Sequence, residues 1–290
     1  MDRYDIAIIG TGPAGLSAAV TAKIRNKNII LFGSNDLSAK IGKAHAVQNY
    51  LGLPAVTGEN MQKAFHSHLD ALQINITEGR VNAVYPMGTC FSIQASGQIY
   101  EADSVILATG VVMEKPYPGE DEFLGRGVSY CATCDAPLYK KKTVAVIAFG
   151  KNEEAEADFL AEVAGKVYYF PMYKEPVQLS DKIQIIREIP ESVTGTTKVQ
   201  QLKTKENSYD VDGIFILRES IAPGQLVPGI VVADNHVQVN RLMETSIAGV
   251  FACGDIVGKP YQYIKSAGEG NIAALSAVNY IDQKKRTEVK

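Results

Sequence analysis

A glycine-rich turn close to the N-terminus constrains the fold of this chain more than any other feature. The turn has the sequence GTGPAG at residues 10–15, follows the apolar run 5–9 and opens a helical pattern over 14–23. A second apolar run at 29–32 completes a predicted strand–helix–strand unit of a parallel sheet. In such a unit the three glycines allow a tight turn, close approach of the backbone to a pyrophosphate, and close packing of the helix on the strand. The free N–H groups of the helix start would bind the phosphates. The sequence therefore predicts a dinucleotide site.

The turn alone does not distinguish FAD from NAD. An acidic residue that binds the ribose usually ends the second strand of such a unit. In this chain that place is taken by Phe32-Gly33-Ser34, and Asp36 is displaced from it. Both cofactors remain open at this point.

The rest of the chain predicts an α/β fold with two Rossmann-like, nucleotide-binding-type domains, the second inserted into the first. A second strand–helix–strand pattern occupies the middle of the chain, and the first domain resumes after it. We expect a discontinuous first domain of residues 1–114 and 220–290, with the inserted domain at 115–219. The predicted elements beyond the first unit are strands at 104–108, 143–147, 167–170, 213–217 and 249–252, and helices at 153–164 and 266–281.

Composition excludes several classes of protein. The 290 residues carry a formal net charge of -3, and no long basic run suggests a nucleic-acid partner. No apolar run approaches the length of a membrane span, and a strand begins within a few residues of Met1, so we expect no signal peptide. Four cysteines do not make a disulfide framework. We expect a cytoplasmic protein that contacts neither membranes nor nucleic acid.

The second constraining motif is the run Cys131-Ala132-Thr133-Cys134-Asp135. Zinc would need two further ligands, and neither Cys90 and Cys253 nor the histidines have a metal-binding spacing, so we expect no metal. A structural disulfide is uncommon in the cytoplasm. Two inert buried cysteines are an alternative. A redox dithiol is favoured, because a C-x-x-C at a helix start lowers a thiol pKa and brings the sulfurs within bonding distance.

Together these motifs resemble the low-molecular-weight thioredoxin reductases, which have the class II pyridine nucleotide-disulfide oxidoreductase fold. The resemblance covers nearly the whole chain and rests on the runs at 10–15, 47–52, 108–110, 131–135, 254–255 and 262–268. It implies FAD in the first domain, the dithiol in the inserted domain, and a homodimer that reduces thioredoxin.

The resemblance also implies residue roles. Cys134 would face the flavin, Cys131 would attack the thioredoxin disulfide, and Asp135 would handle the thiol proton. Asn49 and Gln262 would lie near the isoalloxazine, although turn and capping roles are an alternative for both. The residues implied in binding the cofactor are Gly10, Gly12, Pro13, Ala14, Gly15, Asn49, Thr109, Gly110, Gly254, Asp255 and Gln262.

The chain departs from this family at the second glycine-rich turn, where NADPH would bind. Ala148 replaces the first glycine, Phe149 adds bulk, and glutamates 153, 154 and 156 crowd the helix start. Carboxylates there suit an empty helix N-terminus and repel a phosphate. The segment 170–174 has no arginine to hold a 2′-phosphate. We therefore expect poor use of NADPH.

The degraded second turn makes the resemblance closest to the ferredoxin-dependent flavin thioredoxin reductases. This implies a flow of electrons from ferredoxin through FAD and the Cys131/Cys134 dithiol to thioredoxin. The alternatives are an NADPH-dependent thioredoxin reductase with an atypical site, a flavin dithiol oxidase that uses oxygen, and a redox-sensing flavoprotein without turnover.

The resemblance implies rotation between the domains, with the connections near 111–118 and 217–222 as hinges. Ferredoxins are usually acidic, so the basic runs 140–142 and 284–286 are candidate docking surfaces, although such runs are more often solvated surface. Cys253 is expected to be a buried, apolar cysteine.

Overall fold

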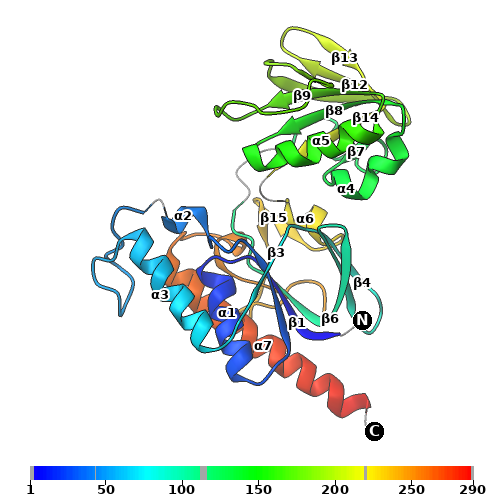
Figure 1. The fold of residues 1–290 in the computed structure, drawn as a ribbon. Helices are drawn as coiled ribbons and strands as arrows, with labels where there is room; N and C mark the ends of the chain where they lie inside the picture. The colour runs from blue at the N-terminus through cyan, green and yellow to red at the C-terminus, as the bar shows by residue number, and fades with distance from the viewer. Residues whose placement is uncertain (1–2, 43, 112–115, 219–220, 289–290) are drawn as a thin grey trace. The chain divides into compact units, whose positions relative to one another are not determined.

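The computed structural model describes residues 3–42, 44–111, 116–218 and 221–288 of the chain. The chain forms two compact units, one of Met1–Val112 with Ala222–Lys290 and the other of Met113–Ile221 (Figure 1). Each unit has its own sheet and its own core. The two connections expected as hinges fall partly outside the described residues.

The first unit is organised around a mainly parallel sheet with the strand order β3-β2-β1-β6-β5-β4, in which β17 also pairs with β6. Strands β1, β2, β3, β6 and β17 run parallel, whereas β4 and β5 form antiparallel ladders next to β6. The strands are β1 (Tyr4–Ile9), β2 (Ile29–Gly33), β3 (Ile76–Glu78), β4 (Val81–Pro86), β5 (Phe91–Ala95), β6 (Gln98–Leu107) and β17 (Val250–Ala252). A small hairpin of β15 (Val232–Ala233) and β16 (His236–Val237) lies outside this sheet.

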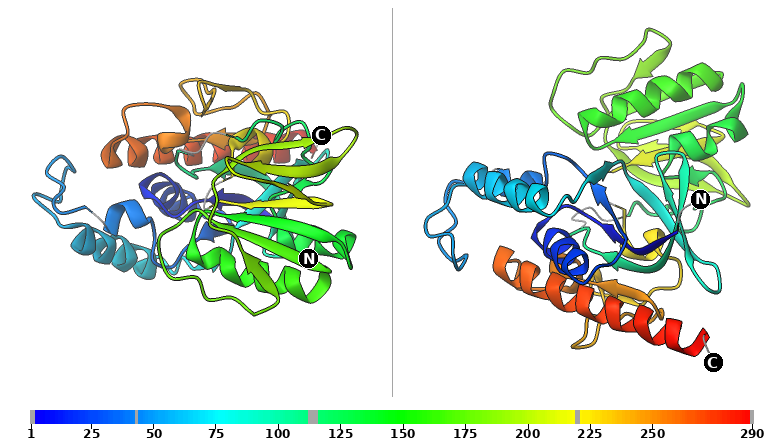
Figure 2. Two further views of the ribbon diagram at one scale, coloured as in Figure 1. Left: turned by 90° about the horizontal axis from the view of Figure 1, so that it is seen from above. Right: turned by 60° about the horizontal axis from the view of Figure 1, so that its bottom comes forward.

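Two helices from opposite ends of the chain lie side by side in this unit (Figures 1 and 2). They are α1 (Pro13–Ile24) and α7 (Tyr263–Glu288), and both contribute residues to the core that includes Ile6, Ile8 and Leu31. The other helices of the unit are α2 (Ala39–Gly42), α3 (Gly58–Ala71) and α6 (Pro223–Leu226).

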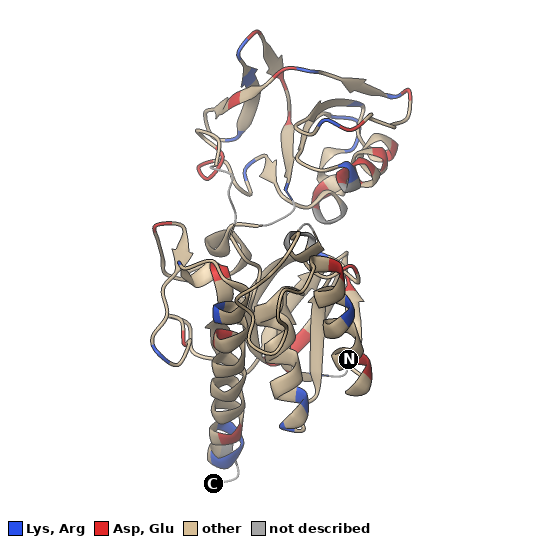
Figure 3. Ribbon diagram, turned by 90° about the vertical axis from the view of Figure 1, so that its left-hand side faces the viewer, with Lys and Arg blue, Asp and Glu red and all other residues tan. Residues whose placement is uncertain are grey.

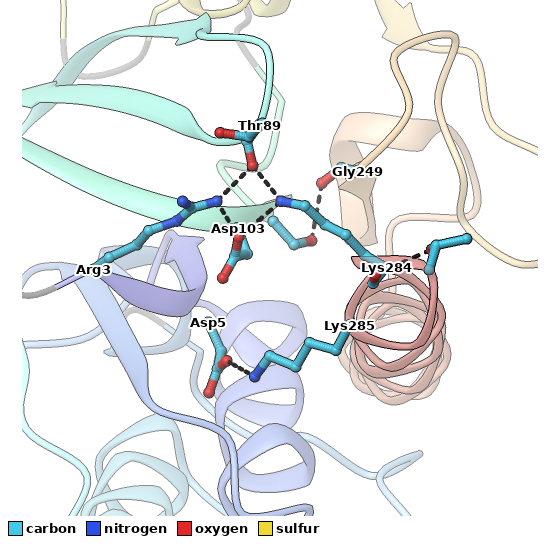
Figure 4. A network of polar contacts seen from close by, with 9 residues as sticks. Arg3, Asp5, Thr89, Asp103, Gly249, Lys284 and Lys285 are labelled. Carbon is cyan, nitrogen blue, oxygen red and sulfur yellow. Dashed lines mark hydrogen bonds and ion pairs between the residues drawn. The ribbon is translucent and has the colours of Figure 1, made fainter. Parts of the chain in front are cut away.

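The C-terminal end of α7 is tied to the sheet by ion pairs. The amine of Lys284 lies 2.9 Å from Asp103, which also accepts from Arg3, and the amine of Lys285 lies 2.9 Å from Asp5 (Figure 4). Figure 3 shows lysine and arginine gathered at this end of the helix, where positive charge complements the helix dipole. These lysines therefore serve the fold of the unit.

The second unit contains a five-stranded parallel sheet in the order β10-β9-β8-β14-β7. Its strands are β7 (Val128–Ser129), β8 (Thr143–Ala148), β9 (Lys166–Pro171), β10 (Ile183–Ile185) and β14 (Gly213–Leu217). A separate antiparallel sheet consists of β11 (Pro190–Gly195), β12 (Val199–Thr204) and β13 (Ser208–Asp210). The α-helices are α4 (Ala132–Asp135) and α5 (Glu154–Val163), with 3₁₀ turns at Ala136–Tyr139 and Lys151–Glu153.

The predicted α/β fold with parallel sheets is confirmed. The strand predicted at 104–108 is longer than expected, because β6 begins at Gln98 and its first half pairs with β5. The C-terminal helix is likewise longer than 266–281 and begins at Tyr263. Helix α3 and the antiparallel strands were not predicted from the sequence.

The crossing of α1 and α7 depends on one glycine. A Cβ atom at Gly270 would lie 2.0 Å from the carbonyl oxygen of Ala14, so neither backbone can keep its position. We predict that Gly270→Ala destabilises the protein by about 1–3 kcal/mol, in spite of the better helix propensity of alanine. Thermal or urea unfolding measures the change. Gln283→Ala, at an exposed position of the same helix, is the control and should stay within about 0.5 kcal/mol of the wild type.

Candidate functional site

Three segments that are distant in the sequence meet at one edge of the first sheet. Ile9 pairs with Leu107, and Leu107 pairs with Ala252, so the carboxyl ends of β1, β6 and β17 lie next to one another. The glycine turn, the segment after β6 and the Gly254-Asp255 turn therefore emerge together. This edge is where the strand order reverses, which is the usual ligand crevice of a doubly wound sheet.

The glycine turn has the form that a pyrophosphate cradle requires. A Cβ on Gly10, whose φ is +118°, would lie 2.3 Å from the carbonyl oxygen of Ala108, and a Cβ on Gly15 would lie 1.9 Å from the carbonyl oxygen of Gly10. In contrast, no described atom lies within 4 Å of a Cβ placed on Gly12. Gly12 is also the N-cap of α1, with Pro13 following it and no side chain capping the helix. The start of α1 thus offers open space and free N–H groups to an anion.

Thr109 supplies an independent sign of a bound group at this edge. Its hydroxyl oxygen is buried and has no hydrogen-bond partner among the residues that the structure describes. A buried hydroxyl without a partner is costly in a folded protein. The neighbouring Gly110 has a φ of +75°, and a Cβ there would meet open space. These observations fit a cofactor that bonds to Thr109 and lies against the glycine turn.

The Gly254-Asp255 turn is held by α7. Asp255 accepts a hydrogen bond of 3.1 Å from the hydroxyl of Ser266, and Glu269 accepts one of 2.9 Å from the backbone N–H of Gly254. The amine of Lys265 lies 2.9 Å from Glu269 and also donates to the carbonyl of Gly254. The Lys265–Glu269 pair was not predicted from the sequence, although a spacing of four residues within a helix is typical of such pairs.

Asn49 and Gln262 are exposed residues of the same unit. Neither side chain has a hydrogen-bond partner among the described residues. Gln262 precedes α7, and its backbone carbonyl accepts from the N–H of Ser266, which is the capping role considered as an alternative. Their placement near an isoalloxazine stays a prediction.

The dithiol motif begins at Cys131, just before α4, and its other four residues form this short helix of the second unit. Cys131 is buried and disulfide-bonded, whereas Cys90 and Cys253 are free thiols. The buried hydroxyl of Ser129 accepts from the N–H of Cys131 at 3.1 Å and lies 3.2 Å from its carbonyl oxygen. Asp135 donates its backbone N–H to the same carbonyl. The side chain of Cys134 lies outside the part of the chain that the structure describes.

The second sheet has its own strand-order reversal, between β8 and β14, and this crevice holds the side chains that follow the two strands. The N–H of Phe149 bonds to the carbonyl of Leu217, which fixes the two strand ends together. The guanidinium of Arg218 lies 5.2 Å from the ring centre of Phe149 and 5.6 Å from that of Tyr117. We refer to Tyr117, Phe149, Arg218 and Glu120 as the aromatic–arginine plug.

Glu120 anchors the plug. Its carboxylate accepts two hydrogen bonds from Arg218, of 2.5 and 2.8 Å, and both side chains are buried. It also accepts from the hydroxyl of Tyr130 at 2.9 Å and from the backbone N–H of Tyr117 at 2.8 Å. Burial opposes the charge on Arg218, but the bonds and the charge of Glu120 outweigh it and raise the arginine pKa. Burial, together with Glu120, also raises the pKa of Tyr130.

The start of α5 is filled by its own acidic side chains. Glu154 is buried and accepts from the hydroxyl of Tyr173 at 2.5 Å and from the backbone N–H of Gln178 at 3.3 Å. The hydroxyl of Tyr173 lies 3.0 Å from that of Tyr169, and burial raises the pKa of Tyr169 to about 12. The segment 170–174 thus presents a tyrosine to a carboxylate where a 2′-phosphate site would need an arginine.

The comparisons with known proteins identify the family. A family model described as pyridine nucleotide-disulphide oxidoreductase matches residues 4–150. The chain is also 31% identical over 302 residues to the thioredoxin reductase of Ureaplasma parvum, with coverage of 96% of this chain and 97% of that protein. This chain is a pyridine nucleotide-disulphide oxidoreductase. The oxidoreductase is 28% identical over 305 residues to the thioredoxin reductase of Bacillus subtilis, covering 98% of this chain and 96% of the relative.

Solved structures agree with this assignment. A crystal structure of a ferredoxin-flavin thioredoxin reductase from Clostridium acetobutylicum has a TM-score of 0.91 and 52% identity, covering 98% of this chain and 99% of that one. A thioredoxin reductase from Gloeobacter violaceus has a TM-score of 0.79 and 25% identity, with coverage of 98% and 95%. The resemblance inferred from the motifs is confirmed, as is FAD as the cofactor, because these homologues are FAD flavoproteins.

Cys253 behaves as an apolar core residue of this oxidoreductase, as predicted. It is fully buried in the first unit, and burial raises its thiol pKa. In the described part of the chain no group of three or more His, Cys, Asp or Glu side chains could hold a metal ion. No helix among the described residues is long and apolar enough to cross a membrane.

The unpaired hydroxyl of Thr109 gives a test of the flavin site. We predict that Thr109→Val leaves the apoprotein as stable as the wild type, or about 1 kcal/mol more stable, because it removes an unsatisfied buried group. The same change should raise the dissociation constant for FAD about three- to tenfold. Unfolding of the apoprotein and a fluorescence titration with FAD measure the two effects.

Thr245→Val is the matched control, because the hydroxyl of Thr245 already donates to the carbonyl of Val250 at 2.8 Å. It should lower stability without changing affinity for FAD. A Thr109→Val protein that loses stability and binds FAD normally would contradict the assignment.

Proposed function

We propose that this oxidoreductase is an FAD-containing thioredoxin reductase that receives its electrons from reduced ferredoxin rather than from NADPH. The observation that carries the proposal is the aromatic–arginine plug in the crevice of the second sheet. A dinucleotide would need that crevice, and the chain fills it with two neighbouring aromatic rings and a buried ion pair whose guanidinium lies next to both rings. The similarity to the ferredoxin-flavin enzyme of Clostridium acetobutylicum supports the same donor.

The electrostatics of α5 support the exclusion of NADPH. Glu154 and Glu156 lie in its first turn, and Glu153 is its N-cap residue. Their carboxylates complement the helix dipole and would repel a pyrophosphate. Displacing the plug would also leave the charge of Arg218 or Glu120 buried without its partner, which typically costs about 3–5 kcal/mol.

Cys131, Cys134 and Asp135 form the proposed catalytic group. In the reduced enzyme the Cys131 thiolate attacks one sulfur of the thioredoxin disulfide, and the other thioredoxin sulfur leaves and takes a proton. Cys134 then displaces the bound sulfur, which re-forms the Cys131–Cys134 disulfide and releases thioredoxin with two thiols. Asp135 would transfer the thiol proton. FAD, held by the first unit, supplies the exchange between a one-electron donor and this two-electron dithiol.

The potentials permit this direction of transfer. A plant-type ferredoxin at about -400 mV lies below thioredoxin at about -270 mV, so two electrons release about 6 kcal/mol. The donor and acceptor are proteins that meet in the cytoplasm, where we place the enzyme. We assign FAD binding to residues 1–114 with 220–290 and the dithiol to residues 115–219.

The two basic runs differ as docking surfaces for ferredoxin. Lys284 and Lys285 are engaged with Asp103 and Asp5 within their own unit. The lysines of the run 140–142 are exposed and form no ion pair among the described residues. The run 140–142, which follows the dithiol turn in the chain, is therefore the better candidate for an acidic partner.

We also propose a homodimer. Helix α7 exposes Ile264, Ile272 and Leu275 on one face, a spacing that puts them in one stripe. Exposed apolar stripes of this kind are typical of subunit interfaces. Leu275→Asp should convert the dimer to a monomer in sedimentation velocity, whereas Gln283→Asp on the same helix should not. A monomeric wild type would contradict the proposal.

The donor is tested by anaerobic titration of the purified FAD protein, with flavin absorbance as the readout. Reduced ferredoxin should bleach the flavin and then produce thioredoxin thiols, and NADPH at tenfold excess should do neither. The Cys134→Ser variant should abolish formation of thioredoxin thiols. Stoichiometric bleaching by NADPH would overturn the proposal.

A measurement of oxygen uptake in air and an assay of turnover with each donor separate the remaining alternatives. Rapid consumption of oxygen with a small dithiol would indicate a dithiol oxidase. A dithiol that is reducible but gives no turnover with any donor would indicate a sensor.

A further inference from the structure

One hydrogen bond joins α5 to the dithiol turn. The carboxylate of Glu156, in the first turn of α5, accepts from the backbone N–H of Ala132 at 3.0 Å. Ala132 directly follows Cys131 and is the first residue of α4, and α4 packs on α5. Glu156, one of the glutamates that would repel a phosphate at the start of α5, is thus in contact with the backbone of the redox motif.

This contact determines which groups surround the start of the dithiol turn. N–H groups at the start of a helical turn normally stabilise a nearby thiolate. Here the N–H of Cys131 is taken by the hydroxyl of Ser129, and the N–H of Ala132 is taken by a carboxylate. The second acceptor brings a negative charge to the residue next to Cys131.

The other acidic residue in the first turn of α5 has a different role. Glu154 is buried and bonded to Tyr173 and to the backbone of Gln178. Of the two glutamates in the first turn of α5, Glu156 is therefore the one whose carboxylate is bonded to the dithiol turn.

We propose that Glu156 is a positioning residue that makes the Cys131/Cys134 dithiol a stronger reductant. A dithiol becomes more oxidising when its thiolate is stabilised, because stabilisation favours the reduced form. A carboxylate beside the turn has the opposite effect, since it raises the free energy of the thiolate and favours the disulfide. This inference rests on the proposed function, in which the dithiol must reduce thioredoxin.

The test is the equilibrium of the holoenzyme disulfide with mixtures of oxidised and reduced dithiothreitol. Trapped thiols are counted by alkylation and mass spectrometry, in the absence of ferredoxin and thioredoxin. Glu156→Gln keeps an oxygen that can accept from Ala132 and removes the charge. It should shift the equilibrium constant roughly three- to tenfold toward the dithiol, and a tenfold shift is about 30 mV for this couple.

Glu162→Gln is the matched control, because it removes the same charge from an exposed position near the other end of α5. It should leave the constant within twofold of the wild type. Glu156→Ala should shift the constant at least as far as Glu156→Gln.

If the equilibrium constant of the Glu156→Gln enzyme stays within twofold of the wild-type constant, the inference is wrong. This holds also if Glu156→Ala alone shifts the constant, because the contact would then be merely structural. Because the readout needs no ferredoxin, the result is independent of the donor. A shift in the expected direction together with flavin bleaching by NADPH would support Glu156 and refute the ferredoxin proposal.

Discussion

A parallel sheet that reverses its strand order leaves a crevice at the carboxyl ends of its two central strands, and both units of this oxidoreductase are built around such a crevice. In the first unit, glycine at positions 10 and 15 lets backbones meet without Cβ atoms, and the space beyond Gly12 stays open. In the second unit, Phe149 and Arg218 directly follow the two strands, and the guanidinium lies 5.2 Å from the ring centre of Phe149. The same architecture therefore leaves open space beside the glycine turn of one unit and is filled by side chains in the other.

The acidic residues at the start of α5 are compatible with a helix N-terminus that binds no phosphate. Carboxylates at a helix N-terminus are stabilising when no anion binds there, so a helix start that holds no phosphate can carry them at no cost in stability. Here the carboxylate of Glu154 accepts a hydrogen bond from the hydroxyl of Tyr173, and that of Glu156 accepts one from the dithiol turn. Figure 3 shows the resulting acidic character of this unit around α5.

The sequence predicted what depends on local pattern. The buried strands around the glycine turn are short apolar runs, and their helices follow in register, so β1, α1 and β2 were found within about two residues. The first half of β6 was missed because its own polar and apolar residues do not alternate clearly, and its pairing with β5 depends on both segments.

The aromatic–arginine plug was predicted only in part. Phe149 was noted as bulk, but Arg218 and Glu120 are almost a hundred residues apart, and only the fold shows that they pair. In the same way, the pattern marked Glu156 as unfavourable for phosphate but gave no sign of its contact with Ala132.

The buried Arg218–Glu120 pair links the filling of the second crevice to the stability of the unit. A glycine at position 148 would not open this crevice, because the aromatic–arginine plug would still fill it. Removing either charged residue would leave the other one buried in the unit without its partner. Removing one member of the pair is therefore expected to lower the stability of the unit, whereas replacing both charged residues together leaves no buried charge without its partner. The residues that fill the crevice are therefore also residues on which the stability of the unit depends, so the crevice cannot be opened one residue at a time without a loss of stability.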